Sequence, residues 1–382
     1  MLEDALSQKL EKRKQESLLR SLITTSGLTD FYSNDYLGLA RSEELYQQIQ
    51  NTVQNLPHQN GATGSRLLSG NNAYTESVEQ QLATVFAGER ALIFNSGYTA
   101  NLAVLSALPQ RGDSILYDER AHTCMKDGAR LSLAQHFSFR HNDLNDLEQK
   151  LKKASGQIFL AVESIYSMDG DECPLTDLVT LAEKYNANIV LDEAHSTGAY
   201  GKNGSGLACA VSLQHKIPVR IYTFGKAMGI HGACIVGSEK IIQYLINFAR
   251  PFIYTTALPP HSIASIACAF KFLSNTISLQ NTLQSRINTF LVNSKSIAQR
   301  IESKSAIQTV LFPGNENARS AAHYLQQNRL DVRAILSPTV PEGSERLRVC
   351  LHTYNTDEEI LTLCKAIKYL TTEKKQHLEH LD

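Results

Sequence analysis

The sequence of 382 residues lacks the features of several large protein classes. No apolar run approaches the roughly 18 residues of a membrane span, and the first residues, Met1–Ala5, are charged rather than signal-like. Lysine and arginine (37) nearly balance aspartate and glutamate (38), with no basic block, which argues against a nucleic-acid partner. We therefore expect a cytoplasmic protein that has neither a membrane nor a nucleic acid as partner.

Paired cysteines are also lacking. The seven cysteines are scattered, without Cys-x-x-Cys spacing, and stand at positions 124, 173, 209, 234, 268, 350 and 364. This pattern predicts free thiols in a reducing compartment and argues against a zinc knuckle. We predict no metal site.

Apolar runs that alternate with helical stretches dominate the middle of the chain. Five runs are predicted strands: Ala91–Phe94, Ser114–Tyr117, Ile158–Val162, Ile189–Leu191 and Arg220–Thr223. Gly232–Val236 follows as a predicted antiparallel or edge strand. The crossover spacing predicts an α/β fold, with a mostly parallel sheet and helices on both faces. Ligands of such sheets bind at the carboxyl ends of the strands, where this chain carries five polar clusters.

The two ends of the chain differ from the middle. In residues 1–23 leucines recur among many charged residues, and this pattern predicts an amphipathic helical arm. A long helical region is expected at about 260–300. After it, short strands alternate with helices, as in a small α+β domain. The expected division is an N-terminal helical arm and substrate loop (1–45), a large cofactor-binding α/β domain (46–275) and a small C-terminal α+β domain (276–382).

Two stretches carry the clearest chemistry. Ile189–Gly198 runs from a buried strand into a turn with Asp192 and His195, and Thr223–Gly229 presents Lys226 among small residues. A carboxylate can keep a heteroaromatic nitrogen protonated, a histidine can bond the neighbouring ring oxygen, and a lysine can form a Schiff base. These are the needs of pyridoxal phosphate. Asp-Glu-Ala-His also occurs in helicases, but the phosphate loop that a helicase needs is lacking.

At these residues the chain resembles a known family, the α-oxoamine synthases. These are pyridoxal-phosphate enzymes of fold type I, with a seven-stranded type of sheet and a smaller C-terminal domain. The resemblance spans nearly the whole chain and rests on seven motifs in family order: Ser33–Gly38, Ser96–Asn101, Glu163–Gly170, Asp192–Gly198, Thr223–Lys226, Thr255–Pro260 and Ser337–Pro341. Together they are highly specific.

The resemblance implies roles for four catalytic residues. Lys226 forms the Schiff base with the cofactor and removes the α-proton of the amino acid. Asp192 pairs with the pyridinium nitrogen, and His195 bonds the phenolic oxygen of the ring. His122 stacks on the ring face and also meets the substrate.

The resemblance also implies how the rest of the cofactor is held. The phosphate is expected at the helix that begins after Ser96, near Gly97 and Tyr98, where backbone N–H groups favour a dianion. Thr223 adds a hydroxyl, and Thr255 adds another from the partner subunit, which makes the enzyme a homodimer. Glu163 and Ser167 lie beside the cofactor ring.

Besides His122, four residues are expected to meet the substrates. Arg348 matches the arginine that holds the amino-acid carboxylate, with Asn34 beside it. Arg20 matches an arginine that meets the acyl substrate, and Thr339 a threonine at the mouth of the site. The chain departs from the family pattern at Tyr74 and at residues 353–356.

The motifs are most similar to those of enzymes that make 8-amino-7-oxononanoate for biotin biosynthesis. This similarity implies decarboxylative condensation of L-alanine with a pimeloyl thioester, carried by acyl-carrier protein or coenzyme A. A 2-amino-3-ketobutyrate ligase, which uses glycine and acetyl-CoA, and a serine palmitoyltransferase remain open, because the Schiff-base machinery is common to all. A non-catalytic family member lacks the lysine that stands here at 226, and a plain aminotransferase lacks the motifs at 33–38 and 337–341.

Overall fold

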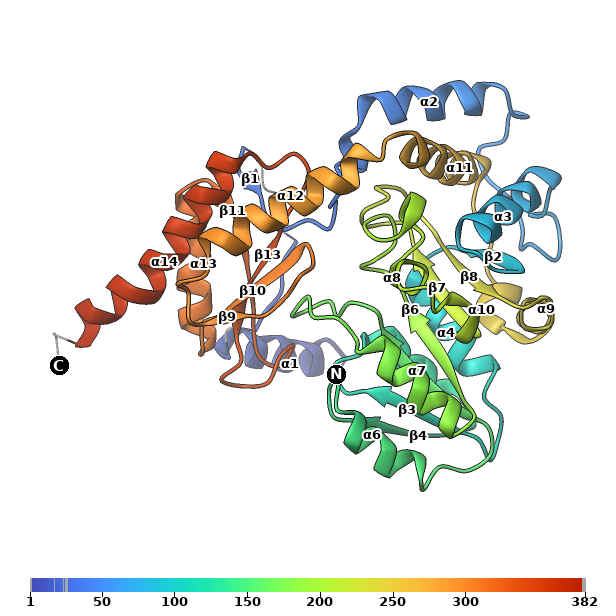
Figure 1. Cartoon of the computed structure of the whole chain (residues 1–382), viewed down its shortest axis with the longest axis horizontal. Coiled ribbons are helices and arrows are strands. Elements are labelled where there is room, and N and C mark those ends of the chain that lie inside the picture. Colours follow the sequence, from blue (N-terminus) through green and yellow to red (C-terminus); the bar gives the residue numbers. More distant parts are fainter. Residues whose placement is uncertain (1, 17, 23, 25–26, 380–382) are drawn as a thin grey trace.

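The computed structural model describes residues 2–16, 18–22, 24 and 27–379. A seven-stranded sheet forms its larger part (Figure 1). The strands lie in the order β2 (Arg90–Phe94), β8 (Ala233–Gly237), β7 (Val219–Thr223), β6 (Ala187–Asp192), β5 (Ile158–Glu163), β3 (Ser114–Asp118) and β4 (Gln135–Phe139). Strand β8 is antiparallel to both of its neighbours, and the remaining pairs are parallel. The predicted mostly parallel sheet is confirmed.

Two strands of this sheet depart from the prediction. The strand predicted at Gly232–Val236 as antiparallel or at an edge is β8. It is antiparallel, but it lies inside the sheet between β2 and β7 rather than at an edge. Strand β4 was not predicted. It lies at the edge of the sheet with four of its five residues exposed, so it has no apolar run to reveal it.

Helices cover both faces of this sheet, as the crossover spacing predicts. Adjacent residues of β6 show the division, because Val190 packs into one apolar cluster and Leu191 into another. The helices of this larger part, not all of which touch the sheet, are α2 (Glu43–Gln54), α3 (Ala73–Val85), α4 (Gly97–Ala107), α5 (Thr123–Leu131), α6 (Leu144–Leu151), α7 (Leu175–Lys184), α8 (Leu207–Ala210), α9 (Glu239–Phe248), α10 (Arg250–Ile253) and α11 (Pro260–Asn275). Alternate strand residues thus bury opposite faces of the sheet.

A smaller antiparallel sheet follows in the C-terminal part. Its order is β12 (Arg333–Ile335), β13 (Arg346–Cys350), β10 (Ile307–Leu311) and β9 (Arg300–Ile301). The helices of this part are α12 (Ser278–Asn293), α13 (Asn315–Gln327) and α14 (Asp357–Glu379) (Figure 1). The architecture is that of fold type I, with a large α/β part and a smaller C-terminal part, as predicted.

The region expected to be one long helical stretch is two helices, because α11 and α12 meet at 74°. No single helix among the described residues is long and apolar enough to cross a membrane. By length and composition alone, only the bent pair α11 and α12 meets that criterion.

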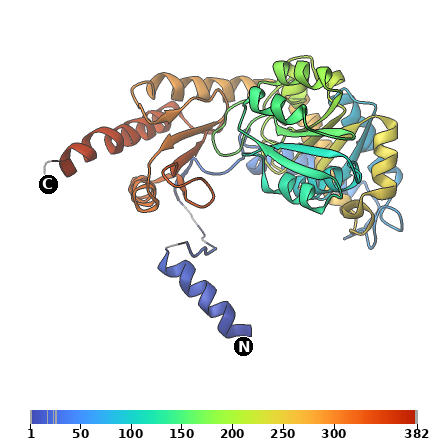
Figure 2. The same cartoon turned by 90° about the horizontal axis from the view of Figure 1, so that it is seen from below.

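The N-terminal arm is helical over a shorter range than predicted. Helix α1 covers Leu2–Gln15 and buries none of its residues, while residues 18–22 are not helical. Leu2 is 74% exposed, and Figure 2 shows α1 standing away from the body. The prediction of a helix to residue 23 was wrong over residues 18–22. The leucines there are not packed against a surface that would stabilise a further helical turn. Residues 17 and 23 lie outside the described part.

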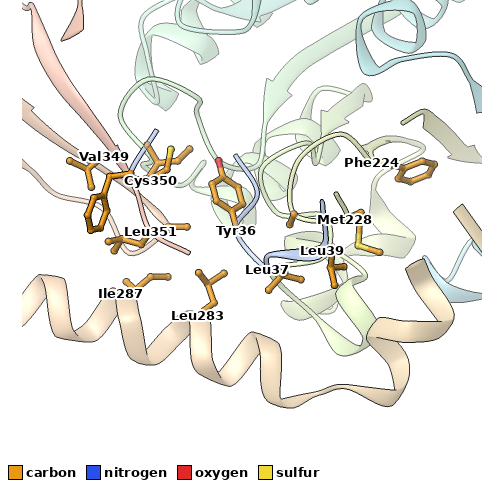
Figure 3. Close-up of a cluster of buried hydrophobic side chains, with 14 of the residues drawn as sticks. Tyr36, Leu37, Leu39, Phe224, Met228, Leu283, Ile287, Val349, Cys350 and Leu351 are labelled. Carbon is orange, nitrogen blue, oxygen red and sulfur yellow. The ribbon is translucent and has the colours of Figure 1, made fainter. Parts of the chain in front are cut away.

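The chain then joins the two sheets. Strand β1 (Thr29–Asp30) pairs in parallel with β11 (Leu330–Asp331) beside the smaller sheet. The following loop buries Tyr36, Leu37 and Leu39 in an apolar cluster that reaches from α12 and β13 to the turn after β7 (Figure 3). This loop is thereby fixed between the two parts of the molecule.

Candidate active site

The ends of three neighbouring strands bring charged and polar side chains together. Glu163 ends β5, Asp192 ends β6, and Thr223 ends β7. Glu163 and Asp192 are direct neighbours in the register and are 2% and 5% exposed. Because parallel strands present their carboxyl ends at one edge, residues distant in sequence meet here.

Lys226 and His195 form the centre of this edge. Lys226 lies in the turn after β7, and its Nζ is 2.9 Å from Nε2 of His195. Desolvation lowers the pKa of Lys226, although the charges of Asp192 and Glu163 oppose this. Burial, aided by the charge of Lys226, lowers the pKa of His195 well below its usual value. His195 is therefore neutral, and it lies beside an amine whose pKa is lowered.

Asp192 is held by two donors. Its Oδ1 accepts the backbone N–H of Ala194 at 2.8 Å, and its Oδ2 accepts Nδ2 of Asn101 at 2.7 Å. Asn101 is fully buried on α4, and it was not predicted as a site residue. The sequence feature that could have pointed to Asn101 is its position as a single amide in an otherwise apolar helix segment. Oδ1 of Asn101 is buried and has no partner in the described part of the chain.

Glu163 and His122 are joined through the backbone. His122 caps the N-terminus of α5, and its N–H donates to Oε1 of Glu163 at 2.6 Å. Burial, with repulsion from Asp192, raises the pKa of Glu163. His122 is exposed as a residue, but its ring is partly buried, and Nδ1 lies 2.9 Å from Sγ of Cys124. Desolvation lowers the pKa of His122 despite the attraction of Asp192.

The N-terminus of α4 meets the end of β7. Ser96 and Thr99 form a capping box there. Gly97 lies so close to Thr223 that a Cβ on it would stand 2.3 Å from Oγ1 of Thr223. The hydroxyl and the free backbone donors of the helix suit a phosphate.

Two further predicted phosphate-site residues lie near this helix end. Tyr98 is 45% exposed and donates its hydroxyl to Asp127 at 2.5 Å. Thr255 accepts from Nδ2 of Asn95 of the same chain at 3.3 Å. Its predicted contribution to the site of a partner subunit stays a prediction.

A second cluster surrounds Arg348 on β13. Its Nε donates to the carbonyl of Ser167 at 2.7 Å and its Nη2 to Oδ1 of Asn34 at 3.0 Å, while Nη1 lies 3.0 Å from Sγ of Cys350. Arg348 is 7% exposed, and its hydrogen-bond partners in the described part of the chain are all neutral. The structure thus joins Arg348, Asn34 and the backbone of Ser167, three positions that the sequence separates widely.

Arg20 and Thr339 also meet, at the protein surface. Nη2 of Arg20 lies 3.5 Å from Oγ1 of Thr339, and both side chains are exposed. Arg20 lies beyond the end of α1, in a non-helical segment. An exposed guanidinium of this kind is available to an anionic end of a substrate.

Tyr36 links the two clusters and was not predicted as a site residue. Its hydroxyl oxygen lies 2.7 Å from Nδ1 of His195 and 3.1 Å from Oδ1 of Asn34. Burial raises the pKa of Tyr36. The phenol therefore stays protonated in this position.

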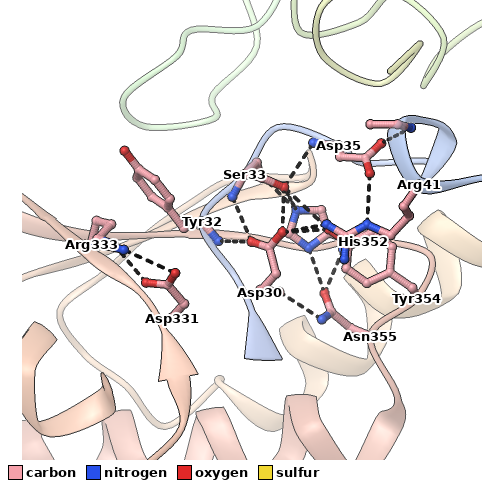
Figure 4. A network of polar contacts seen from close by, with 11 residues as sticks. Asp30, Tyr32, Ser33, Asp35, Arg41, Asp331, Arg333, His352, Tyr354 and Asn355 are labelled. Atoms are coloured by element: carbon pink, nitrogen blue, oxygen red, sulfur yellow. Dashed lines mark hydrogen bonds and ion pairs between the residues drawn. The ribbon is translucent and has the colours of Figure 1, made fainter. Parts of the chain in front are cut away.

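The departures from the family pattern after Arg348 lie in a polar network (Figure 4). Tyr354 donates its hydroxyl to Asp30 at 2.9 Å, and Asn355 donates to the Asp30 carbonyl at 3.0 Å. His352 lies 2.9 Å from the Ser33 carbonyl. These residues hold the loop that carries Asn34, rather than entering the site.

Comparison with known proteins gives the family. The profile of the aminotransferase class I and II family matches residues 26–367. The chain belongs to this family. It is 37% identical to the 8-amino-7-oxononanoate synthase of Emericella nidulans, over 96% of this chain and 95% of that protein. It is 35% identical to the enzyme of the same name from Marinobacter nauticus, over 94% and 95%.

Solved structures agree. Serine palmitoyltransferase from S. paucimobilis, with bound pyridoxal phosphate and myriocin, superposes with a TM-score of 0.87 at 25% identity, over 96% of each chain. The 8-amino-7-oxononanoate synthase from Francisella tularensis gives a TM-score of 0.79 at 30% identity, over 92% of this chain and 99% of that one. The resemblance to the α-oxoamine synthases is thus confirmed, and the protein is an enzyme of the acyltransferase type that depends on pyridoxal phosphate.

The residues present fit this cofactor. Lys226 offers an amine of lowered pKa, and Asp192 a fixed carboxylate at the same sheet edge. The close approach of Gly97 and Thr223 places a hydroxyl at the N-terminus of α4. Amine, carboxylate and anion site together are the donor set that pyridoxal phosphate needs.

Proposed function

We propose that this enzyme condenses L-alanine with a pimeloyl thioester, carried by acyl-carrier protein or coenzyme A. The products are 8-amino-7-oxononanoate, carbon dioxide and the free thiol carrier, and the pathway is biotin biosynthesis. The observation that best supports this proposal is the buried guanidinium of Arg348, which has only neutral partners among the described residues. A buried charge without a counterion calls for an anionic ligand, and the carboxylate of an amino acid is one. The names of the relatives support the choice of reaction.

The side chains divide the work as follows. Bound pyridoxal phosphate supplies an aldehyde and a ring that accepts an electron pair. Lys226 would hold the cofactor through its amine, and the same amine would serve as the base for the α-proton of the amino acid. Asp192 keeps the proton on the ring nitrogen, and Asn101 orients Asp192. His195 and His122 orient the ring. Thr223, Gly97 and Tyr98 hold the phosphate end, and Glu163 and Ser167 line the ring.

The substrates are held at two ends. Arg348 binds the alanine carboxylate with the help of Asn34, because a fixed guanidinium can give two parallel bonds. Alanine offers little else to hold. At the surface, Arg20 beside Thr339 meets the far carboxyl or ester of the pimeloyl chain. An acetyl group is too short to reach from the site to this pair.

We also propose a homodimer in which Thr255 completes the site of the partner subunit. Support comes from the match of Thr255–Pro260 to the family motif whose threonine reaches the partner's site. Mixing Lys226→Ala chains with chains crippled at Thr255 tests this arrangement, because one site of each heterodimer escapes both lesions. Heterodimers that regain no activity would contradict the shared site.

A serine palmitoyltransferase is the second candidate, because those structures superpose with the higher TM-score. The deciding experiment is mass spectrometry of the products when alanine, glycine and serine are each offered with pimeloyl, acetyl and palmitoyl thioesters. We expect the highest kcat/KM for alanine with the pimeloyl thioester. Faster turnover of glycine with acetyl-CoA, or of serine with palmitoyl-CoA, would replace the proposal by the ligase or the palmitoyltransferase.

A further inference from the structure

The ring of His122 has two hydrogen-bonding groups of Cys124 at one of its nitrogens. The backbone N–H of Cys124 donates to Nδ1 at 3.3 Å, and so His122 caps the N-terminus of α5. The thiol of the same cysteine lies 2.9 Å from Nδ1. Nε2, the other ring nitrogen, has no hydrogen-bond partner among the described residues. One side of the ring is thus held by the protein, and the other is free for a ligand.

Burial decides the protonation of both side chains. It lowers the pKa of His122, so the ring is neutral and carries one proton. The charges of Asp192 and Lys226 also act on this ring, because it lies at the same sheet edge. Burial raises the pKa of the Cys124 thiol well above its usual value, so the thiol keeps its proton and can donate it.

The contacts of Nδ1 assign the ring proton. A protonated Nδ1 would point its N–H at the backbone N–H of Cys124, and two donors repel each other. With a lone pair on Nδ1, the backbone N–H and the thiol S–H can both donate to it. The bond that one ring nitrogen makes sets the tautomer of a histidine, so the proton of His122 stands on Nε2.

We propose that Cys124 is a positioning residue for His122. Its thiol and its backbone N–H keep Nδ1 as an acceptor, so that His122 presents Nε2–H as a donor to an acceptor oxygen of the bound substrate. A carboxylate oxygen and a thioester carbonyl oxygen are acceptors of this kind. The inference rests on the proposed place of His122 beside the cofactor ring and the substrate, but not on which amino acid or which acyl chain the enzyme uses.

The first test is nitrogen NMR of the full-length, cofactor-loaded protein with ¹⁵N-labelled histidine, in which His122→Gln identifies the signals of His122. In the wild type, Nε2 should carry the proton and Nδ1 should not. Cys124→Val keeps an apolar side chain of similar size but removes the donor. In this variant the ratio of Nδ1–H to Nε2–H should rise about fivefold, which corresponds to one net hydrogen bond. Cys124→Ser supplies a hydroxyl donor and should restore the ratio.

Steady-state kinetics is the second readout, with the pair of substrates that the enzyme turns over fastest. Cys124→Val should lower kcat/KM about fivefold, and Cys124→Ser should stay within about twofold of the wild type. Cys173→Val is the matched control. Cys173 is also a buried free thiol, but it packs into the apolar cluster on the opposite face of the sheet, so its replacement should change neither readout.

A proton on Nδ1 in the wild type overturns the proposal. A Cys124→Val variant that keeps both the ratio and kcat/KM also overturns it, as does one that loses turnover while the ratio stays unchanged, because the thiol would then act by packing alone. Cys124→Ala gives the same comparison if the branched valine prevents folding. A product other than 8-amino-7-oxononanoate would contradict the proposed function, but it would leave the expected tautomer of His122 in place.

Discussion

Two clusters of buried charge in this molecule differ in how completely their polar atoms are paired. At the edge of the large sheet, Glu163 and Asp192 lie side by side with like charge, and Lys226 has a neutral histidine as its hydrogen-bond partner. The pKa of Lys226 is lowered and that of Glu163 is raised, each first of all by burial. Oδ1 of Asn101 has no partner among the described residues. Such a region is held ready for a ligand at a cost in stability.

The network between the N-terminal loop and the smaller sheet is the opposite case (Figure 4). Asp30 accepts from the backbone of Tyr32 and Ser33 and from the side chains of Ser33, Arg41 and Tyr354. Although burial opposes ionisation, the backbone bonds from Ser33 and Tyr32, the charge of His352 and the Ser33 hydroxyl together lower the pKa of Asp30 well below its usual value. The comparison shows that charges with complete hydrogen bonding stabilise the fold, whereas charges with incomplete hydrogen bonding gather at the candidate active site.

The largest effect is expected at Lys226. Lys226→Ala should lower kcat by about 10³-fold or more, because the nucleophile and the base are lost together. The free energy of unfolding of the cofactor-free variant should be unchanged or higher, because a partly desolvated amine is removed. Steady-state turnover and urea unfolding measure the two effects. A variant that loses stability but keeps turnover would show that Lys226 stabilises the fold rather than serving the active site.

Asp192→Asn should lower kcat on the order of a hundredfold while the bond from Asn101 can be kept by rotation of the new amide. The physical reason is the loss of the negative charge that keeps the ring nitrogen protonated. The absorption spectrum of the loaded variant and its kcat report the effect. A nearly normal rate would mean that another group holds that proton.

His141 lies near the same sheet edge as the candidate site, but its charge is paired. It contacts Asp118 at 2.9 Å and Asp171 at 2.6 Å, so it tests whether pairing rather than location stabilises the protein. Burial by itself would lower its pKa, but the two carboxylates raise it to about 9. Its stabilisation is therefore fully present below about pH 6.5, the unfolded value, and is lost as the pH rises through 9.

His141→Gln should remove this pH dependence, on the order of 3 kcal/mol at most. Urea unfolding between about pH 6.5 and 9.5 measures it. The exposed His58→Gln should keep the wild-type slope. Equal slopes in His141→Gln and the wild type would show that the paired histidine stabilises nothing.

Asp30→Ala should lower the free energy of unfolding by about 2 kcal/mol, because five donors lose their acceptor. We expect kcat to stay within about threefold of the wild type, because Asp30 does not enter the site. Urea unfolding and turnover of the same preparation decide this. A loss of turnover without a loss of stability would place Asp30 in the site.

The smallest effect is expected at Arg20. Arg20→Ala should lower kcat/KM for the pimeloyl thioester about tenfold, because one charge-assisted bond is lost, and should leave acetyl-CoA unaffected. Arg13→Ala, on helix α1, is the control and should change neither. An equal loss for both thioesters would show that Arg20 does not read the far end of the acyl chain.

Much of the fold follows from local pattern. Buried parallel strands such as Ile158–Glu163 are apolar over their length, so they stand out, and their polar ends mark the sheet edge where Asp192 and Lys226 meet. Strand β4 and the end of α1 could not be found in this way. The first is an exposed edge strand, and the second depends on contacts that α1 does not make.

By itself, the sequence singled out the residues that we propose carry the chemistry, because lysine, aspartate and histidine stand in short motifs with fixed neighbours. Only the tertiary structure decided how the substrate side is joined to them. Tyr36, Asn101 and the pairing of Asn34 with Arg348 depend on chain segments up to 314 residues apart. No local periodicity encodes such contacts, because they exist only once the N-terminal loop is packed between the two sheets.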